Sequence, residues 1–169
     1  MARPVIVCYD GSRASSEALG YTAQVVPSAP VLVVTVWREI DEEMLASGAA
    51  PPAGDPVEVN VQTRRAAQEA ARTGAERARA AGLDAEPLVV KTGGPIWKAI
   101  EAVAEERDAL LIVCGTGRSG LKTVMPGDVA ISLVQHASKP VLVVPTSKAS
   151  AERRKSFERD QRPSRAPAL

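Results

Sequence analysis

Residues 111–145 read LIVCGTGRSGLKTVMPGDVAISLVQHASKPVLVVP and contain two apolar runs with a helical pattern between them. The runs, at 109–114 and 140–145, are nearly continuous and rich in β-branched side chains. Such runs are typical of strands that are buried on both faces of a parallel sheet. The segment 127–138 lies between two prolines and predicts a helix. The stretch therefore predicts one strand–helix–strand unit with parallel strands.

The same alternation extends from this stretch to the N-terminus. Three more apolar runs and three more helical patterns follow one another, so that five strands alternate with four helices. This order predicts an α/β fold with an open parallel sheet and helices on both faces. Ligands of such sheets bind beyond the carboxyl ends of the strands. The additional strands are expected at 4–9, 31–37 and 86–91, and the additional helices at 12–26, 61–81 and 95–107.

Two segments fall outside the alternation. Residues 38–57 are acidic and then rich in Ala, Gly and Pro, which predicts a mobile excursion after the second strand. Residues 146–169 have no apolar period and predict a basic tail that is flexible or partly helical. The tail carries seven basic and three acidic side chains, a charge of +4, so residues 1–145 carry −3 of the total of +1. The 169 residues thus divide into one domain, 1–145, and the tail.

Composition excludes several classes of protein. The slightly acidic balance of residues 1–145 argues against nucleic-acid binding. Two cysteines without a CxxC pair and a single histidine are too few for a zinc site, and they make a Ser-His-Asp hydrolase improbable. No apolar run approaches the ~18 residues of a membrane span, and residues 1–12 do not resemble a signal peptide. We therefore expect a soluble cytoplasmic protein without membrane or nucleic-acid partners.

Three stretches together carry a resemblance to a known family: VIVCYDGS at 5–12, GGPIWKAI at 93–100, and residues 111–145. They resemble the universal stress protein family over residues 4–145. The resemblance implies a Rossmann-like sheet with the strand order 3-2-1-4-5. It also implies a homodimer that pairs through the last strand, here Val141, Leu142, Val143 and Val144. One branch of the family binds ATP, and another branch does not.

The ATP-binding branch has the pattern Gly-x2-Gly-x9-Gly-Ser/Thr after the fourth strand, where glycines and a helix N-terminus meet the phosphates. Gly117 and Gly127 have the nine-residue spacing of this pattern. The sequence departs from the pattern at two positions. Cys114 stands three residues before Gly117, with Gly115 one residue later, and Asp128 replaces the hydroxyl residue after Gly127.

Asp128 leaves three interpretations open. Its carboxylate repels a phosphate: two unit charges ~4 Å apart repel by about 1 kcal/mol in water and about 4 kcal/mol at an effective dielectric constant near 20. The larger value corresponds to roughly a thousandfold loss of affinity. A bridging Mg²⁺ would reverse the sign, because carboxylates and phosphates are its usual ligands. Alternatively, Asp128 caps the following helix and occupies the N–H groups that a phosphate would use.

The resemblance assigns further positions to the nucleotide. Asp10 corresponds to the acid that contacts the adenosine, and Val36 to the residue whose backbone meets the adenine. Asp10 is equally interpretable as a turn residue, and Val36 as a core residue. Arg118, Ser119 and Gly120 complete a polar loop, in which Arg118 would pair with a phosphate and Ser119 would donate to one.

Two main hypotheses of function follow. In the first, the chain is a universal stress protein that binds ATP, with Mg²⁺, as a regulatory module of the stress response. In the second, it binds no ATP and acts as a dimeric protein-interaction module. A weak ATPase is a third hypothesis, but no side chain is an obvious base, so no catalytic residue is predicted. Cys8 and Cys114 are interpreted either as a redox-sensing pair or as small buried hydrophobes.

Overall fold

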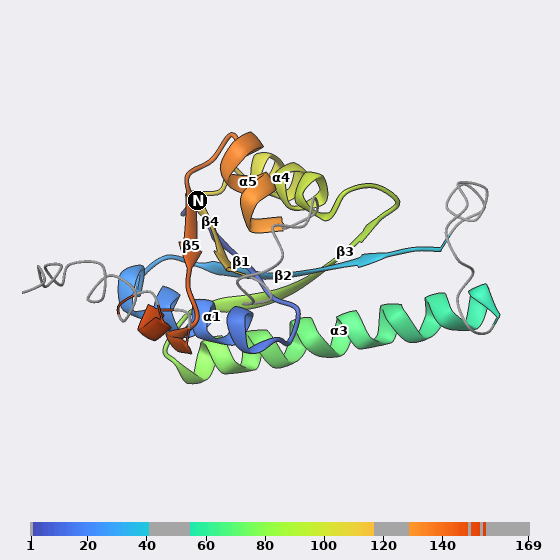
Figure 1. The fold of residues 1–169 in the computed structure, drawn as a ribbon, viewed down its shortest axis with the longest axis horizontal. Helices are drawn as coiled ribbons and strands as arrows, with labels where there is room; N and C mark the ends of the chain where they lie inside the picture. Colours follow the sequence, from blue (N-terminus) through green and yellow to red (C-terminus); the bar gives the residue numbers. More distant parts are fainter. Residues whose placement is uncertain (1, 41–54, 117–128, 149, 153, 155–169) are drawn as a thin grey trace, which may run out of the picture.

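A computed structural model describes residues 2–40, 55–116, 129–148, 150–152 and 154. Within these residues, five parallel strands form one sheet in the order β3-β2-β1-β4-β5 (Figure 1). Both the predicted fold class and the predicted strand order are confirmed. The strands are β1 (Val5–Cys8), β2 (Val31–Arg38), β3 (Ala85–Thr92), β4 (Leu111–Gly115) and β5 (Val141–Val144).

The strands differ in length, and this difference shapes one end of the sheet. β2 and β3 have eight residues each, whereas β1 has four. The last register pair between β1 and β2 joins Cys8 to Val34. Residues 35–38 of β2 continue beyond that pair and are matched only by β3, up to the pair of Arg38 with Thr92. A two-stranded extension of β2 and β3 therefore projects past the carboxyl end of β1.

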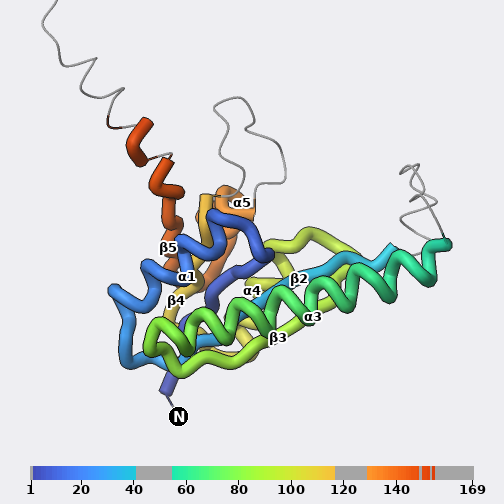
Figure 2. The backbone as a smooth tube through the Cα atoms, turned by 90° about the horizontal axis from the view of Figure 1, so that it is seen from below, coloured from blue at the N-terminus to red at the C-terminus, as the bar shows by residue number. Residues whose placement is uncertain are grey.

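Helices cover both faces of the sheet, as predicted. α1 (Arg13–Val25) and α3 (Pro56–Ala80) lie on one face, and α4 (Ile96–Glu106) and α5 (Val129–His136) lie on the other (Figure 1). Figure 2 shows that α3 runs lengthwise beside β2 and β3. α3 is the longest helix described, yet neither it nor another helix of the described residues has the apolar length needed to cross a bilayer.

The core consists of two apolar layers, one on each face of the sheet. Successive residues of a strand point to opposite faces, so that Val5 and Val7 pack on the α1–α3 side and Ile6 on the α4–α5 side. All three side chains are fully buried. The β-branched runs of the sequence therefore arise because the central strands are covered on both faces.

Small residues allow α3 to lie close to the sheet. Its buried positions are Ala67, Ala71, Gly74, Ala75 and Ala78. A Cβ atom on Gly74 would lie 2.8 Å from both Cδ1 of Tyr9 and Cγ1 of Val33, so the helix backbone is already in contact with side chains of the sheet.

α3 begins five residues earlier than the predicted start at 61, and this prediction was wrong. Asp55 caps the helix, because its side chain accepts a hydrogen bond from the backbone N–H of Val57 at 3.0 Å, and Pro56 occupies the first turn. The first turns contribute no apolar side chain to the core, since Val57 is 70 % exposed and Val61 is 45 % exposed. Hydrophobic periodicity therefore could not detect them. Of the predicted excursion 38–57, residues 41–54 lie outside the described residues.

The chain after β5 is attached to α1. Ser147 donates two hydrogen bonds to the carboxylate of Glu17, from its backbone N–H at 2.6 Å and from its hydroxyl at 3.0 Å. Arg13 donates to the same carboxylate at 2.7 Å and to the Ser147 hydroxyl at 2.9 Å. These hydrogen bonds, first from Arg13 and then from Ser147, lower the pKa of Glu17. The described residues that follow, 147, 148, 150–152 and 154, are helical.

The close approach at Gly74 generates a prediction about stability. Gly74→Ala is expected to destabilise the protein, although alanine is favoured in helices by about 1 kcal/mol. Crowding of a packed core costs about 1–3 kcal/mol, and both Tyr9 and Val33 are buried side chains that cannot move aside. The free energy of unfolding is measured by urea denaturation.

Gly20→Ala is the matched control. Gly20 also lies inside a helix, but a Cβ atom there would meet nothing within 4 Å. This variant is expected to gain about 0.5–1 kcal/mol of stability. If Gly74→Ala stabilises the protein as much as Gly20→Ala does, α3 is not packed against the sheet as described.

Candidate functional site

The strand order reverses between β1 and β4, and the carboxyl end of β2 lies beside that of β1. Open α/β sheets bind ligands at such a point. Three of the predicted site residues are described there. Asp10 follows β1, Val36 lies in the extension of β2, and Gly115 ends β4.

Val36 presents backbone groups to the space beyond the end of β1. In a parallel ladder, the N–H and C=O groups of one residue face the same neighbouring strand, and successive residues alternate. The carbonyls of Pro30 and Val34 accept hydrogen bonds from β1 and Tyr9, whereas the N–H of Val31 donates toward β3. Val36 therefore faces the β1 side, but the register of β1 with β2 ends at Val34. Among the described residues, the Val36 backbone has no ladder partner on that side.

Asp10 is held as an ionised turn residue at the start of α1. Its Oδ1 atom accepts a hydrogen bond from the backbone N–H of Ser12 at 3.0 Å, and Gly11 has a φ of 79°. Partial burial raises the pKa of Asp10, but hydrogen bonds from Ser12 and Ser15 outweigh this effect, and the net pKa is lowered. The carboxylate remains exposed, so it is an anionic acceptor at the edge of the site.

Gly115 has a clear packing role. A Cβ atom at this position would lie 2.6 Å from the backbone oxygen of Ala14, in the first turn of α1. The next residue, Thr116, donates its backbone N–H to the carbonyl of Val144 at 3.1 Å. Its Oγ1 atom is buried and makes no hydrogen bond within the described part of the chain. Sequence reasoning assigned Gly115 to the phosphates and missed its contact with α1, because that contact joins segments a hundred residues apart.

The remaining predicted site residues lie outside the described residues. They are Gly117, Arg118, Ser119, Gly120, Gly127 and Asp128. The structure therefore describes the residues assigned to the base and the ribose, and both this part of the site and the part assigned to the phosphates stay predictions. In the described ranges, no cluster of three or more His, Cys, Asp or Glu side chains is placed to hold a metal ion.

The two cysteines lie on the adjacent strands β1 and β4, on the α4–α5 side of the sheet. Burial raises the pKa of the Cys8 thiol well above its ordinary value, and the charges of Cys114 and Asp10 add to the shift. Thiol chemistry proceeds through the thiolate. This environment therefore favours the interpretation of Cys8 as a small buried hydrophobe over that of a redox sensor.

Comparison with known proteins gives a consistent picture. The family model described as "Universal stress protein family" matches residues 1–145. Among solved structures, a universal stress protein in complex with cAMP is 26 % identical, with a TM-score of 0.63, and the match covers 86 % of this chain and 99 % of the other. A protein of the universal stress protein family from Burkholderia pseudomallei is 25 % identical, with a TM-score of 0.66 and coverages of 85 % and 96 %.

A more distant structure shares the fold. The universal stress protein from Archaeoglobus fulgidus in complex with dAMP is 21 % identical, with a TM-score of 0.58, and the match covers 83 % of this chain and 96 % of the other. The search among curated proteins found no match.

The environment of the two thiols, of which Cys114 is buried and Cys8 partly buried, generates a prediction about reactivity. In the native state at pH 7.5, a disulfide reagent such as Ellman's reagent is expected to modify Cys8 and Cys114 slowly, because Cys114 is only 3 % exposed and the pKa of Cys8 is raised. Both should react at once in denaturing urea. Rapid native labelling that is lost in Cys8→Ala would instead support the redox interpretation.

Proposed function

Because the chain belongs to the universal stress protein family, we propose that it is a nucleotide-binding regulatory module of the stress response, with ATP as the ligand. One observation carries the proposal. The backbone of Val36 in β2 is unmatched on the side of β1, and the ionised carboxylate of Asp10 follows the carboxyl end of β1.

These two groups complement the adenosine half of the ligand. An adenine edge has one acceptor and one donor side by side, and a single extended residue has a backbone N–H and C=O on the same side. Val36 would therefore pair with the base. Asp10 would accept hydrogen bonds from the ribose hydroxyls, which is a charge-assisted interaction because its pKa is lowered. The relative that is 26 % identical holds cAMP, which contains the same adenine base.

The phosphate half of the proposal depends on the loop after β4. Gly117, Gly127 and the polar residues Arg118, Ser119 and Gly120 would surround the phosphates, with Thr116 at the start of the loop. Asp128 would take part through a bridging Mg²⁺, because a carboxylate without a metal repels phosphate. We propose that the output is an altered surface for a protein partner rather than turnover of ATP.

Titration calorimetry with ATP, AMP and cAMP, with and without Mg²⁺, tests the proposal. Asp10→Asn is expected to weaken all three nucleotides by about tenfold or more, because a hydrogen bond to a charged group contributes about 1.5–3 kcal/mol. Asp84→Asn is the matched control, since Asp84 is an exposed acid at the opposite end of the sheet.

Asp128→Ser is expected to remove the Mg²⁺ dependence of ATP binding.

Two other outcomes would redirect the interpretation. Binding of ATP only by Asp128→Ser would mean that the carboxylate of Asp128 alone prevents ATP from binding at a site whose other residues can still bind it. No binding of any nucleotide by either form would contradict the proposal and favour the second hypothesis, a dimeric interaction module without ATP.

We further propose a cytoplasmic homodimer that pairs through β5. β5 is an edge strand of the sheet. The carbonyl of Pro140 accepts a hydrogen bond from β4, and that of Val144 accepts one from Thr116, which follows β4. The alternation of the ladder therefore turns the backbone groups of Val141 and Val143 toward the open edge. Such an edge is a template for pairing with a second copy. The thiols of Cys8 and Cys114 are compatible with a reducing compartment.

The outward N–H of Val143 allows a sharp test of this dimer. Val143→Pro removes that donor without removing a hydrogen bond to β4, and an edge strand tolerates proline. The variant is expected to be a folded monomer by size-exclusion chromatography with light scattering. Val143→Thr keeps both the N–H and the β-branched shape, and it should remain a dimer. A dimeric Val143→Pro would place the interface elsewhere.

A further inference from the structure

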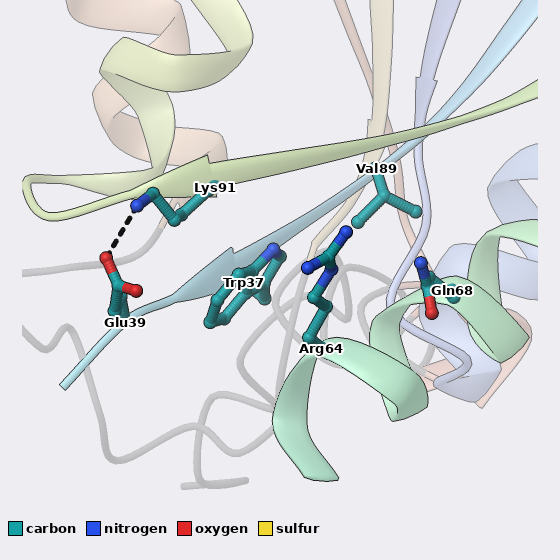
Figure 3. A pocket seen from close by; sticks show the side chains of 6 residues that line it. All are labelled: Trp37, Glu39, Arg64, Gln68, Val89 and Lys91. Carbon is teal, nitrogen blue, oxygen red and sulfur yellow. Dashed lines mark hydrogen bonds and ion pairs between the residues drawn. The ribbon is translucent and has the colours of Figure 1, made fainter. Parts of the chain in front are cut away.

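A pocket of about 430 Å³ lies between α3 and the projecting extension of β2 and β3 (Figure 3). Trp37 and Glu39 come from β2 and the residue that follows it, Val89 and Lys91 come from β3, and Arg64 and Gln68 come from α3. Trp37 and Lys91 are register partners, as are Thr35 and Val89, so the strand residues of the pocket share the face turned to α3. Pockets for small ligands usually measure about 300–1,000 Å³, and this one lies at the lower end.

The indole of Trp37 is a donor without an acceptor. The residue is only 9 % exposed. Its ring N–H makes no hydrogen bond to any described residue, and its nitrogen is not among the buried unpartnered atoms of these residues, so the N–H is accessible from the pocket. Figure 3 shows the indole nitrogen on the side of the ring that faces Arg64. An indole N–H donates only, so a group bound at this position would be an acceptor.

Two more donors lie on the same side of the pocket. Arg64 and Gln68 are one helical turn apart on α3 and both line the pocket, and Figure 3 shows Arg64 pointing toward the β2–β3 extension. Neither side chain has a hydrogen-bond or ion-pair partner in the part of the chain that the structure describes. Other arginines of α3 differ in this respect. Arg72 pairs with two glutamates at 2.6 and 2.8 Å, and Arg79 donates to a carbonyl at 2.8 Å.

The charges of the pocket select a monoanion. Lys91 is neutralised by Glu39, with 2.6 Å between Nζ and Oε2. The guanidinium of Arg64 therefore leaves one net positive charge. A phosphate dianion would bring a second negative charge close to Glu39, where like charges repel. A carboxylate brings only one, and its two oxygens match the donors of a guanidinium.

The walls of the pocket add an apolar surface. The methyl groups of Val89 and the ring of Trp37 lie beside the three donors (Figure 3). Ligand sites typically combine such apolar walls with a few polar groups that fix orientation. A flat hydrocarbon body joined to a carboxylate satisfies both parts of the pocket.

We propose that this pocket binds a small aromatic monocarboxylate, whose oxygens accept hydrogen bonds from the indole N–H of Trp37, the guanidinium of Arg64 and the amide of Gln68. The site is distinct from the proposed nucleotide site. The nucleotide would meet the backbone edge of β2 at Val36, whereas the carboxylate would lie on the face of β2 that is covered by α3.

Nitrogen–proton correlation spectra test the proposal, because the chain has two tryptophans and hence two indole N–H signals. Trp97→Phe assigns the signal of Trp37. Benzoate is the probe, added to about 10 mM, which would nearly saturate a site with a Kd of about 1 mM. The Trp37 N–H signal is expected to shift with saturation, while that of Trp97 stays fixed. Benzamide, which has the same shape without the charge, is expected to cause no saturable shift.

Matched variants identify the donor. Arg64→Gln is expected to weaken benzoate binding about tenfold or more, because it removes a charge-assisted hydrogen bond. Arg65→Gln removes a neighbouring exposed charge of the same helix that does not line the pocket, and it should leave the affinity unchanged. Asp10→Asn should also leave it unchanged, so failure of the nucleotide proposal is separable from failure of this one.

Three results would overturn the proposal. The first is an absence of any saturable shift of the Trp37 signal with benzoate. The second is an equal response of Arg64→Gln and Arg65→Gln, which would mean that the pocket does not hold the carboxylate. The third is that inorganic phosphate binds more tightly than benzoate and that its binding depends on Arg64. The pocket would then be a phosphate site and not a carboxylate site.

Discussion

The unequal length of neighbouring strands is the constraint on which the functional features of this molecule depend. β1 ends its pairing with β2 at Cys8, but β2 and β3 remain paired up to Arg38 and Thr92. The extension of β2 therefore has one matched edge and one open edge. The chain turns at Asp10 toward α1, and the backbone of Val36 faces the space beyond the end of β1. A sheet with strands of equal length would have neither feature.

The same extension requires a long helix to cover it. α3 has 25 residues, and its buried side is formed by alanine and glycine. Larger side chains would hold the helix farther from β2 and β3, whereas Gly74 lets its backbone touch Tyr9 and Val33. The buried stripe runs from Ala67 to Ala78. The helix turns that carry Arg64 and Gln68 lie nearer its start, where strand residues and helix residues surround a pocket instead of a filled core.

The regular part of the fold could be predicted from the sequence because it depends on local patterns. All five strands lie within two residues of their apolar runs, since burial on both faces leaves a continuous β-branched signal. The early start of α3 could not be predicted from periodicity, because Val57 and Val61 do not contribute to the core. Asp55 and Pro56 are a local start signal, which the neighbouring Ala, Gly and Pro residues obscured.

The candidate sites were harder to predict because each depends on contacts between distant segments. From the sequence, Gly115 is compatible with a phosphate-binding loop. Its close contact with Ala14 becomes visible only when β4 and α1 are packed together. The attachment of Ser147 to Glu17 likewise joins segments that are 130 residues apart in the sequence. The pocket at Trp37 has no sequence motif at all, because Arg64 and Lys91 reach it from two other elements.

The proposed nucleotide site thus divides into two halves that differ in how the sequence encodes them. The adenosine half relies on the backbone of Val36, and almost any side chain that fits the sheet would present the same N–H and C=O groups. Strand length, rather than residue identity, determines the proposed contact with the base, whereas the proposed contact with the ribose depends on the carboxylate of Asp10. The phosphate half relies on residue types, because only glycine allows close backbone approach and only particular side chains balance the phosphate charge. A change such as Asp128 therefore alters the proposed recognition of phosphates while the surface for the base persists. Ligand choice among adenine nucleotides would then be set in the loop after β4, on a sheet whose shape already favours the base.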